Sequence, residues 1–348
     1  MTKREFLAGL AAATGVTLVG PAGAWADRIR ILGGTPRDGD VPYATGQVSP
    51  EWRRLVAAVK VGDQKSHGAL HVFWLHGPAA AAPLAIATLE DARARGDLVI
   101  TERESATVPS LVVDNRGKTH VLLLAGEILL GGKQNRVVTE DVLLPPRSGP
   151  VDLQVYCVEQ GRWSVGGGGM GFGARGTFAA PQLRSKVMER KSQAEVWAEV
   201  SRYAARAAAP SPSGSYQAIY DKPEVKAHQA EVERTLDART APGALGAAVF
   251  AGGTFAGLDL FQDAALFAGE WPKLLRAHAL ETYDRGAIRD VNERERRARV
   301  EELLRRAAAV EGSLRRGAGV GALFEFRLDK QRGAALVAEG QVVHAAVL

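Results

Sequence analysis

The chain has 348 residues, of which 46% are hydrophobic and 24% are charged, a composition typical of a globular protein with a sizeable core. Its formal net charge is +5, but most basic residues are interleaved with acidic ones. This pattern favours a solvated surface over a nucleic-acid-binding face, so no nucleic-acid partner is expected. The single cysteine, Cys157, excludes an intramolecular disulfide.

Residues 1–26 have the pattern of a signal peptide. Lys3 and Arg4 give a positive start, a weakly apolar stretch rich in Ala and Gly follows, and Ala24-Trp25-Ala26 fits the small-x-small cleavage rule. The opening TKREFL resembles a twin-arginine export motif in which lysine replaces the first arginine. We expect cleavage near Ala26 and a periplasmic or secreted mature protein, with the twin-arginine and general secretory routes both open. No later segment is apolar enough to predict a membrane span.

The first half of the mature chain is predicted to consist mainly of short strands. A capped helix interrupts them: Thr88 is followed three residues later by Asp91, as in a capping box, and Gly96 supplies a helix stop. Close turns rich in Gly, Pro and Asn separate the strands, which indicates a sandwich or barrel-like sheet. A short helix is predicted at 52–61, and strands at 69–75, 98–101, 109–113, 120–125, 134–138, 142–144 and 151–159.

Helices dominate the second half, after a glycine-rich loop at residues 166–176. This loop lacks the Gly-Lys-Ser/Thr ending of a P-loop and is interpreted as a surface loop. Ser192 and Glu195 form a capping box, and Gly252-Gly253 predicts a hairpin turn. Helices are predicted at 192–204, 224–239, 271–283 and 290–314, and strands within 247–261, 324–328 and 334–348.

The order of these elements indicates an α+β fold, because strands and helices do not alternate regularly. We predict an antiparallel β-sandwich or barrel-like N-terminal part, followed by a helix-rich C-terminal part containing β-hairpins. Residues 27–348 are predicted to form a single α+β domain, with two lobes meeting near residues 165–185 as the alternative.

The densest β signal, at residues 121–164, carries a run of polar side chains that we call the polar block: Lys133, Gln134, Asn135 and Arg136. Burying such groups is costly unless they pair or bind a ligand. We expect Glu127 to meet the block across a turn, and Glu159 and Arg162 to lie at the end of a neighbouring strand.

Two interpretations of this cluster remain open. In the first, Arg136 and Arg162 bind a small anionic ligand and Glu127 and Glu159 act as acid/base groups, since arginine suits phosphate or carboxylate. In the second, the cluster is a structural salt-bridge network in a non-enzymatic exported structural or interaction module. The two differ in whether Arg136 and Glu159 converge on solvent or on each other.

Other reactive side chains receive structural interpretations. Cys157 alternates with apolar residues on one strand face, so its thiol is interpreted as packing. His71 and His76 would point to opposite faces of a strand, and the chain contains no zinc motif, so neither a metal nor a cofactor is expected. Asp259 is interpreted as a turn or capping residue, and His344 as a satisfied core or edge histidine.

Several segments resemble the ARG and Rhodanese-Phosphatase-superfamily-associated protein domain, a bacterial domain of unknown function. They are AGEILLGGKQNRVV, VYCVEQGRW, LEDARARGDLVITE and GLDLFQD with the following Trp271. The resemblance covers most of the mature chain. It implies that the functional positions are Glu127, Lys133, Gln134, Asn135, Arg136, Cys157, Glu159, Arg162, Trp163 and Asp259. The family's association with ADP-ribosylglycohydrolase and phosphatase-type proteins implies an ADP-ribosyl or nucleotide-derived ligand.

Overall fold

The computed structural model describes residues 46–102, 110–162, 171–286 and 288–348, all within one unit, Tyr43–Leu348. The expected signal peptide and Trp163 lie outside the described residues.

The largest sheet is antiparallel and eight-stranded, in the order β1-β2-β12-β13-β17-β16-β15-β14. Its strands come from both ends of the described chain, because β2 pairs with β12 across a long stretch of sequence. The α+β class is confirmed, but the expected division into a β-rich N-terminal and a helix-rich C-terminal part is not. The strands are β1 (Lys60–His67), β2 (Leu70–His76), β12 (Ala244–Ala251), β13 (Thr254–Phe261), β14 (Gly312–Arg316), β15 (Ala322–Leu328), β16 (Gln331–Ala338) and β17 (Gln341–Val347).

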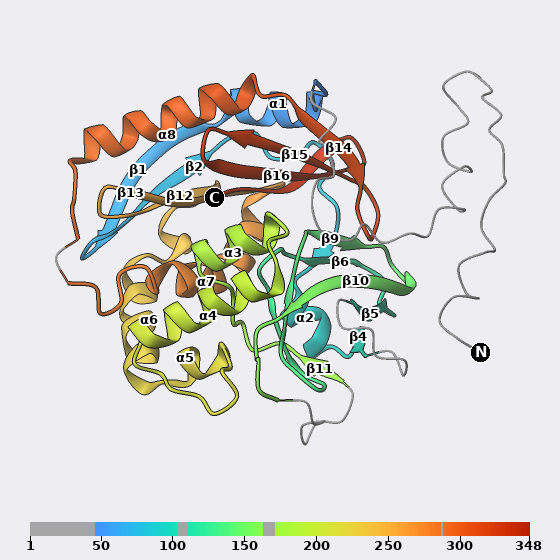
Figure 1. Ribbon diagram of the computed structural model, residues 1–348. Coiled ribbons are helices and arrows are strands. Elements are labelled where there is room, and N and C mark those ends of the chain that lie inside the picture. Colours follow the sequence, from blue (N-terminus) through green and yellow to red (C-terminus); the bar gives the residue numbers. More distant parts are fainter. Residues whose placement is uncertain (1–45, 103–109, 163–170, 287) are drawn as a thin grey trace, which may run out of the picture. The chain divides into compact units, whose positions relative to one another are not determined.

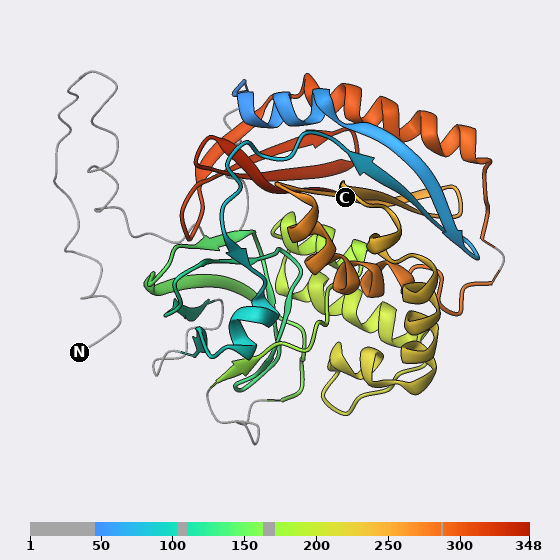
Figure 2. The same cartoon turned by 180° about the vertical axis from the view of Figure 1, so that it is seen from behind.

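Helices cover both faces of this sheet (Figure 1, Figure 2). On one face α1 (Pro50–Ala58) and α8 (Glu293–Ala308) lie side by side, and Trp52 and Val300 pack there against the sheet residue Phe250. On the other face α7 (Ala264–Ala279) packs Trp271 against Trp74 of β2, with ring centroids 5.4 Å apart. The sheet is therefore buried on both sides, which explains why β2 and β12 are apolar at nearly every position.

A second β structure forms a nearly closed barrel. A six-stranded sheet has the order β11-β7-β8-β10-β5-β4, and a bridge between Thr101 and Gly171 joins its two edges. A three-stranded sheet, β3-β6-β9, shares its apolar core with α2 (Leu89–Ala94). The strands are β3 (Ile86–Ala87), β4 (Leu98–Thr101), β5 (Ser110–Asn115), β6 (His120–Leu123), β7 (Ile128–Gly131), β8 (Arg136–Val138), β9 (Val142–Leu144), β10 (Gly149–Cys157) and β11 (Phe172–Gly173).

A group of short helices packs against the barrel through a core that includes Ile128, Val137 and Tyr216. The helices are α3 (Pro181–Met188), α4 (Gln193–Arg206), α5 (Gln217–Asp221) and α6 (Pro223–Thr235). The 3₁₀ helix η2 (Ala238–Thr240) packs instead in the core beneath α7. Ser192 and Glu195 make the expected capping box at the start of α4. None of the helices in the described part of the chain is long and apolar enough to cross a membrane.

Candidate functional site

The polar block bonds mainly to itself and to neighbouring backbone. Gln134 donates from Nε2 to the Glu159 carbonyl oxygen at 2.8 Å, and Arg136 donates from Nη1 to Gln134 Oε1 at 3.1 Å. Arg136 also lies 3.4 Å from the Glu102 carboxylate, and the backbone N–H of Lys133 donates to that same carboxylate. Gln134 and Arg136 are buried, so they hold a corner of the barrel together.

Glu159 and Arg162 extend this network. The Glu159 carboxylate accepts hydrogen bonds from Arg162 Nε at 2.9 Å, Ser213 Oγ at 2.7 Å and the Asn135 backbone at 3.1 Å. Burial opposes ionisation, but these three donors outweigh it and lower the pKa of Glu159. Arg162 also donates to the Gly132 carbonyl oxygen. The side chains of Arg136 and Glu159 point neither to open solvent nor to each other. Gln134 lies between the two residues: its amide oxygen accepts from Arg136, and its amide nitrogen donates to the Glu159 carbonyl oxygen.

Cys157 lies buried beside the block, opposite Arg136 across β10 and β8. Burial raises the pKa of its thiol, which disfavours the reactive thiolate form.

Glu127 does not join the polar block, contrary to the sequence-based expectation. It lies at the other end of β7, in what we call the carboxylate cluster: Glu90 of α2, Glu127, and Glu270 of α7, arranged around Lys273. Lys273 Nζ lies 2.9 Å from Glu90 and 2.6 Å from Glu270, and it also donates to Glu127. The reason is that Glu127 ends the turn after β6, where the chain faces α7.

Burial dominates the acid–base properties of this cluster. It raises the pKa of Glu127 well above its usual range, against the lowering effect of Lys273, and it raises the pKa of Glu270 in the same way. Burial would lower the pKa of Lys273, but the three carboxylates more than offset it and raise that pKa. The ammonium form of Lys273 is therefore favoured.

Gly126 permits this arrangement. Its φ is +103°, and a Cβ there would lie 2.9 Å from the Phe178 ring and 3.0 Å from the Arg184 side chain. Without a side chain at this position, Arg184 reaches past and donates from Nε to the Ala125 carbonyl oxygen at 2.8 Å.

Asp259 is not a turn or capping residue, because it lies within β13 and is fully buried. It belongs to a second group, the histidine network, in which His344 Nε2 lies 3.1 Å and Arg184 Nη1 lies 2.7 Å from Asp259 Oδ1. His344 Nδ1 lies 2.6 Å from Asp141. Burial would lower the pKa of His344, but the two aspartates raise it to about 9. His344 is thus a satisfied core histidine, and the network is a balanced set of two anions and two cations.

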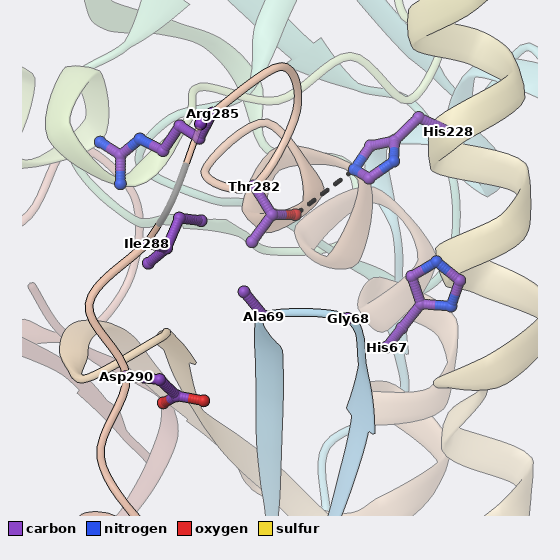
Figure 3. A pocket seen from close by; sticks show the side chains of 9 residues that line it. His67, Gly68, Ala69, His228, Thr282, Arg285, Ile288 and Asp290 are labelled. Atoms are coloured by element: carbon purple, nitrogen blue, oxygen red, sulfur yellow. Dashed lines mark hydrogen bonds between the residues drawn. The ribbon is translucent and has the colours of Figure 1, made fainter.

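An open cavity of about 450 Å³ lies elsewhere in the molecule (Figure 3). The turn between β1 and β2, helix α6 and the segment after α7 surround it. Figure 3 shows the ring of His228 hydrogen-bonded to Thr282 and the ring of His67 next to that of His228. The lining residues are His67, Gly68, Ala69, His228, Thr282, Arg285, Gly286, Ile288 and Asp290.

Several polar groups in the open cavity are held in place by neighbours. His228 Nε2 lies 3.1 Å from the Ala279 carbonyl oxygen, which assigns the proton to Nε2 and leaves Nδ1 as an acceptor. Burial lowers the pKa of His228, so its ring is neutral near pH 7. Asp290 lies 2.5 Å from Arg296 and 3.2 Å from His71.

The sequence-based interpretation missed the residues of the open cavity and the partners of Glu127. One signal for the latter exists in the sequence: Glu270 and Lys273 interrupt an otherwise apolar helical stretch, LFAGEWPKLL, where charges are rarely buried unless paired. No local signal marks the cavity, because its residues come from three distant segments.

The fold and these sites define an α+β domain with buried ion networks and an open cavity. The chain belongs to the ARG and Rhodanese-Phosphatase-superfamily-associated Protein domain family, whose model matches residues 58–348. No curated protein and no solved structure matches the chain.

Proposed function

We propose that this protein binds a small anionic ligand, phosphorylated or of the ADP-ribosyl type, in the open cavity. The observation that carries the proposal is that two histidines, an arginine, a threonine and an aspartate line a space of about 450 Å³. Ligand pockets typically measure ~300–1,000 Å³ and hold a few convergent polar groups.

Arg285 is the anion-binding group in this proposal. Arg285 forms an ion pair with Glu281 at 3.5 Å, and its side chain is 32% exposed, so part of the guanidinium is open to solvent. A guanidinium binds phosphate oxygens in a bidentate fashion.

The other lining groups suit a sugar. Arg296 and His71 hold the Asp290 carboxylate in place. Burial alone would raise the pKa of Asp290, but the backbone N–H of Val291 and the nearby His71 lower it. Asp290 is therefore an acceptor for hydroxyl groups. The neutral ring of His228 offers a further acceptor. The geometry of the cavity does not define a chemical reaction, so the proposal is limited to ligand binding.

The polar block receives a different role in this account. Gln134, Arg136, Glu159 and Arg162 are hydrogen-bonded within it, which favours the structural interpretation, in which the block fixes a corner of the barrel. Among the described residues, Arg136 Nε alone of these arginine nitrogens is buried without a hydrogen-bond partner. The polar block is the alternative binding site for the anion. The titration described next distinguishes the block from the open cavity.

The experiment is isothermal titration of the mature chain with ADP-ribose and ribose 5-phosphate, with ribose as the uncharged comparison. We expect binding of the charged ligands and a loss of about tenfold or more in affinity in Arg285→Ala. The matched control is Arg305→Ala, which removes an exposed arginine of α8 away from the cavity. Full binding by Arg285→Ala together with loss in a folded Arg162→Ala variant would move the site to the polar block.

We also propose that the protein is exported, as the pattern of residues 1–26 supports. Expression of the full chain in a bacterial host, followed by fractionation and N-terminal sequencing, should yield a periplasmic product that begins near Asp27. An intact N-terminus in the cytoplasmic fraction would contradict export.

A further inference from the structure

We propose that Glu90, Glu127 and Glu270 form a binding site for a hard divalent cation such as Mg²⁺ or Mn²⁺, which competes with the ammonium group of Lys273. This site is separate from the open cavity and does not depend on the proposed anionic ligand.

The three carboxylates already have the spacing of ligands around one ion. One oxygen from each lies within 4.8 Å of the others. Mg²⁺–oxygen bonds are ~2.0–2.1 Å and Ca²⁺–oxygen bonds ~2.3–2.6 Å, so oxygens that share one ion lie at most about 4–5 Å apart. The ligands come from α2, the start of β7 and α7, three elements held together by packed cores.

Unsatisfied oxygens in the cluster provide a second, independent observation. Glu270 is 0% exposed; its Oε2 forms an ion pair with Lys273 at 2.6 Å, and no group in the described part of the chain donates a hydrogen bond to its Oε1. Oε2 of Glu127, which is 1% exposed, also lacks a donor among the described residues. Buried carboxylate oxygens are normally bonded to donors or to metal ions, and here they lie among other carboxylates.

The charge in the cluster is unbalanced. Three carboxyl groups surround one ammonium group, so full ionisation of the cluster would leave two negative charges in excess, and burial disfavours that state by raising the pKa of Glu127 and Glu270. The neighbouring histidine network cannot supply the missing charge, because Asp141 and Asp259 already balance His344 and Arg184. One divalent cation would compensate the charge of the fully ionised cluster, which is costly to bury unpaired.

The donor set selects the kind of cation. All three ligands are carboxylate oxygens, which suit Mg²⁺, Mn²⁺ and Ca²⁺, whereas zinc sites mostly use sulfur or nitrogen. The Glu90 side chain is 35% exposed and gives solvent access, so the ion can enter and keep water ligands.

Lys273 is the competitor in this site. Its Nζ contacts all three carboxylates and so supplies the single positive charge that a metal would replace or join. Removal of the ammonium should therefore strengthen metal binding, while removal of one carboxylate should weaken it. A purely structural salt bridge predicts no such opposite pair of effects.

The experiment uses the mature chain with MnCl₂, followed by calorimetry and by electron paramagnetic resonance of bound Mn²⁺. We expect one ion per chain, an affinity weaker by about tenfold or more in Glu270→Gln, and an affinity stronger by about tenfold in Lys273→Met. Glu302→Gln, an exposed carboxylate of α8, is the matched control and should bind as the unmodified chain does.

Two results would overturn the proposal. One is the absence of Mn²⁺ binding at about 1 mM by the unmodified chain and by Lys273→Met alike. The other is unchanged binding in Glu270→Gln. If Lys273→Met does not fold alone, the proposal expects MnCl₂ to restore its folding, and failure of that rescue counts against it.

Discussion

Glu127 and Glu159 have the same side chain, yet their pKa values move in opposite directions. Glu127 is buried beside two other carboxylates, so burial raises its pKa. Glu159 is also partly buried, but donors from Arg162, Ser213 and Asn135 lower its pKa. The residue type alone therefore does not assign a role, because the immediate donors decide which protonation state is stable.

The first prediction at this scale concerns Glu159→Gln. The change keeps the shape but weakens three charge-assisted hydrogen bonds, so the free energy of unfolding should fall by about 1–3 kcal/mol. Urea denaturation measures it. Glu302→Gln, which breaks an exposed ion pair with Arg305, should change stability by less than about 1 kcal/mol. Equal effects of the two substitutions would mean that the network adds no stability.

The second prediction concerns pH. The folded pKa of His344 is about 9, above the ordinary value of 6.5, so the folded state binds the proton more tightly than the unfolded state. Its stabilisation is complete below about pH 6.5 and is lost as the pH rises through about 9. Stability measured in urea should decline over this window.

His344→Gln provides the comparison for this pH effect. The variant removes the titrating group, so its stability should vary less between pH 6.5 and 9 than that of the unmodified chain, whatever its absolute stability. Parallel pH profiles for the two proteins would exclude His344 as the cause.

At the scale of elements, local signals predicted the elements with strong patterns. Strands β4 and β9 have the expected bounds, Thr88 caps α2, and the hairpin of β12 and β13 turns at Gly252-Gly253. Edge strands were missed. β1, KVGDQKSH, is mostly half-buried or exposed, so it lacks the apolar alternation that marks a strand, and β14 was assigned to the preceding helix.

Gly126 connects β6 to β7, and its substitution tests how that turn places Glu127. Gly126→Ala should lower stability by about 2 kcal/mol or more, because a methyl group would meet Phe178 and Arg184 at a positive φ. Gly96→Ala is the control, since Gly96 also has a positive φ, +73°, but has open space around it. Thermal denaturation should show a clearly larger loss for Gly126→Ala; equal losses would mean that backbone strain alone matters.

At the scale of the whole molecule, the sites depend on contacts that no local pattern encodes. Lys273 meets Glu127 across 146 residues of chain, and His344 meets Asp141 across 203. The polar block was predictable as a cluster because its members are close in sequence, and Glu159 and Arg162 do join it. Glu127 was misplaced because a side chain next to a turn can face either side, and only the packing of α7 decides which.

The family resemblance is confirmed over residues 58–348, and the residues that carry it divide between two places. Gln134, Asn135, Arg136, Glu159 and Arg162 form the corner of the barrel, whereas Glu127 and Asp259 lie in the buried ion networks. The open cavity is formed by other residues, so the ligand proposal rests on geometry rather than on these motifs.

The most direct test of the central claim is a crystal structure of the protein with ADP-ribose. The account predicts ligand density in the open cavity, with a phosphate group at Arg285 and a sugar hydroxyl at Asp290. Density at Arg162 and the polar block, with the cavity unchanged, would contradict it.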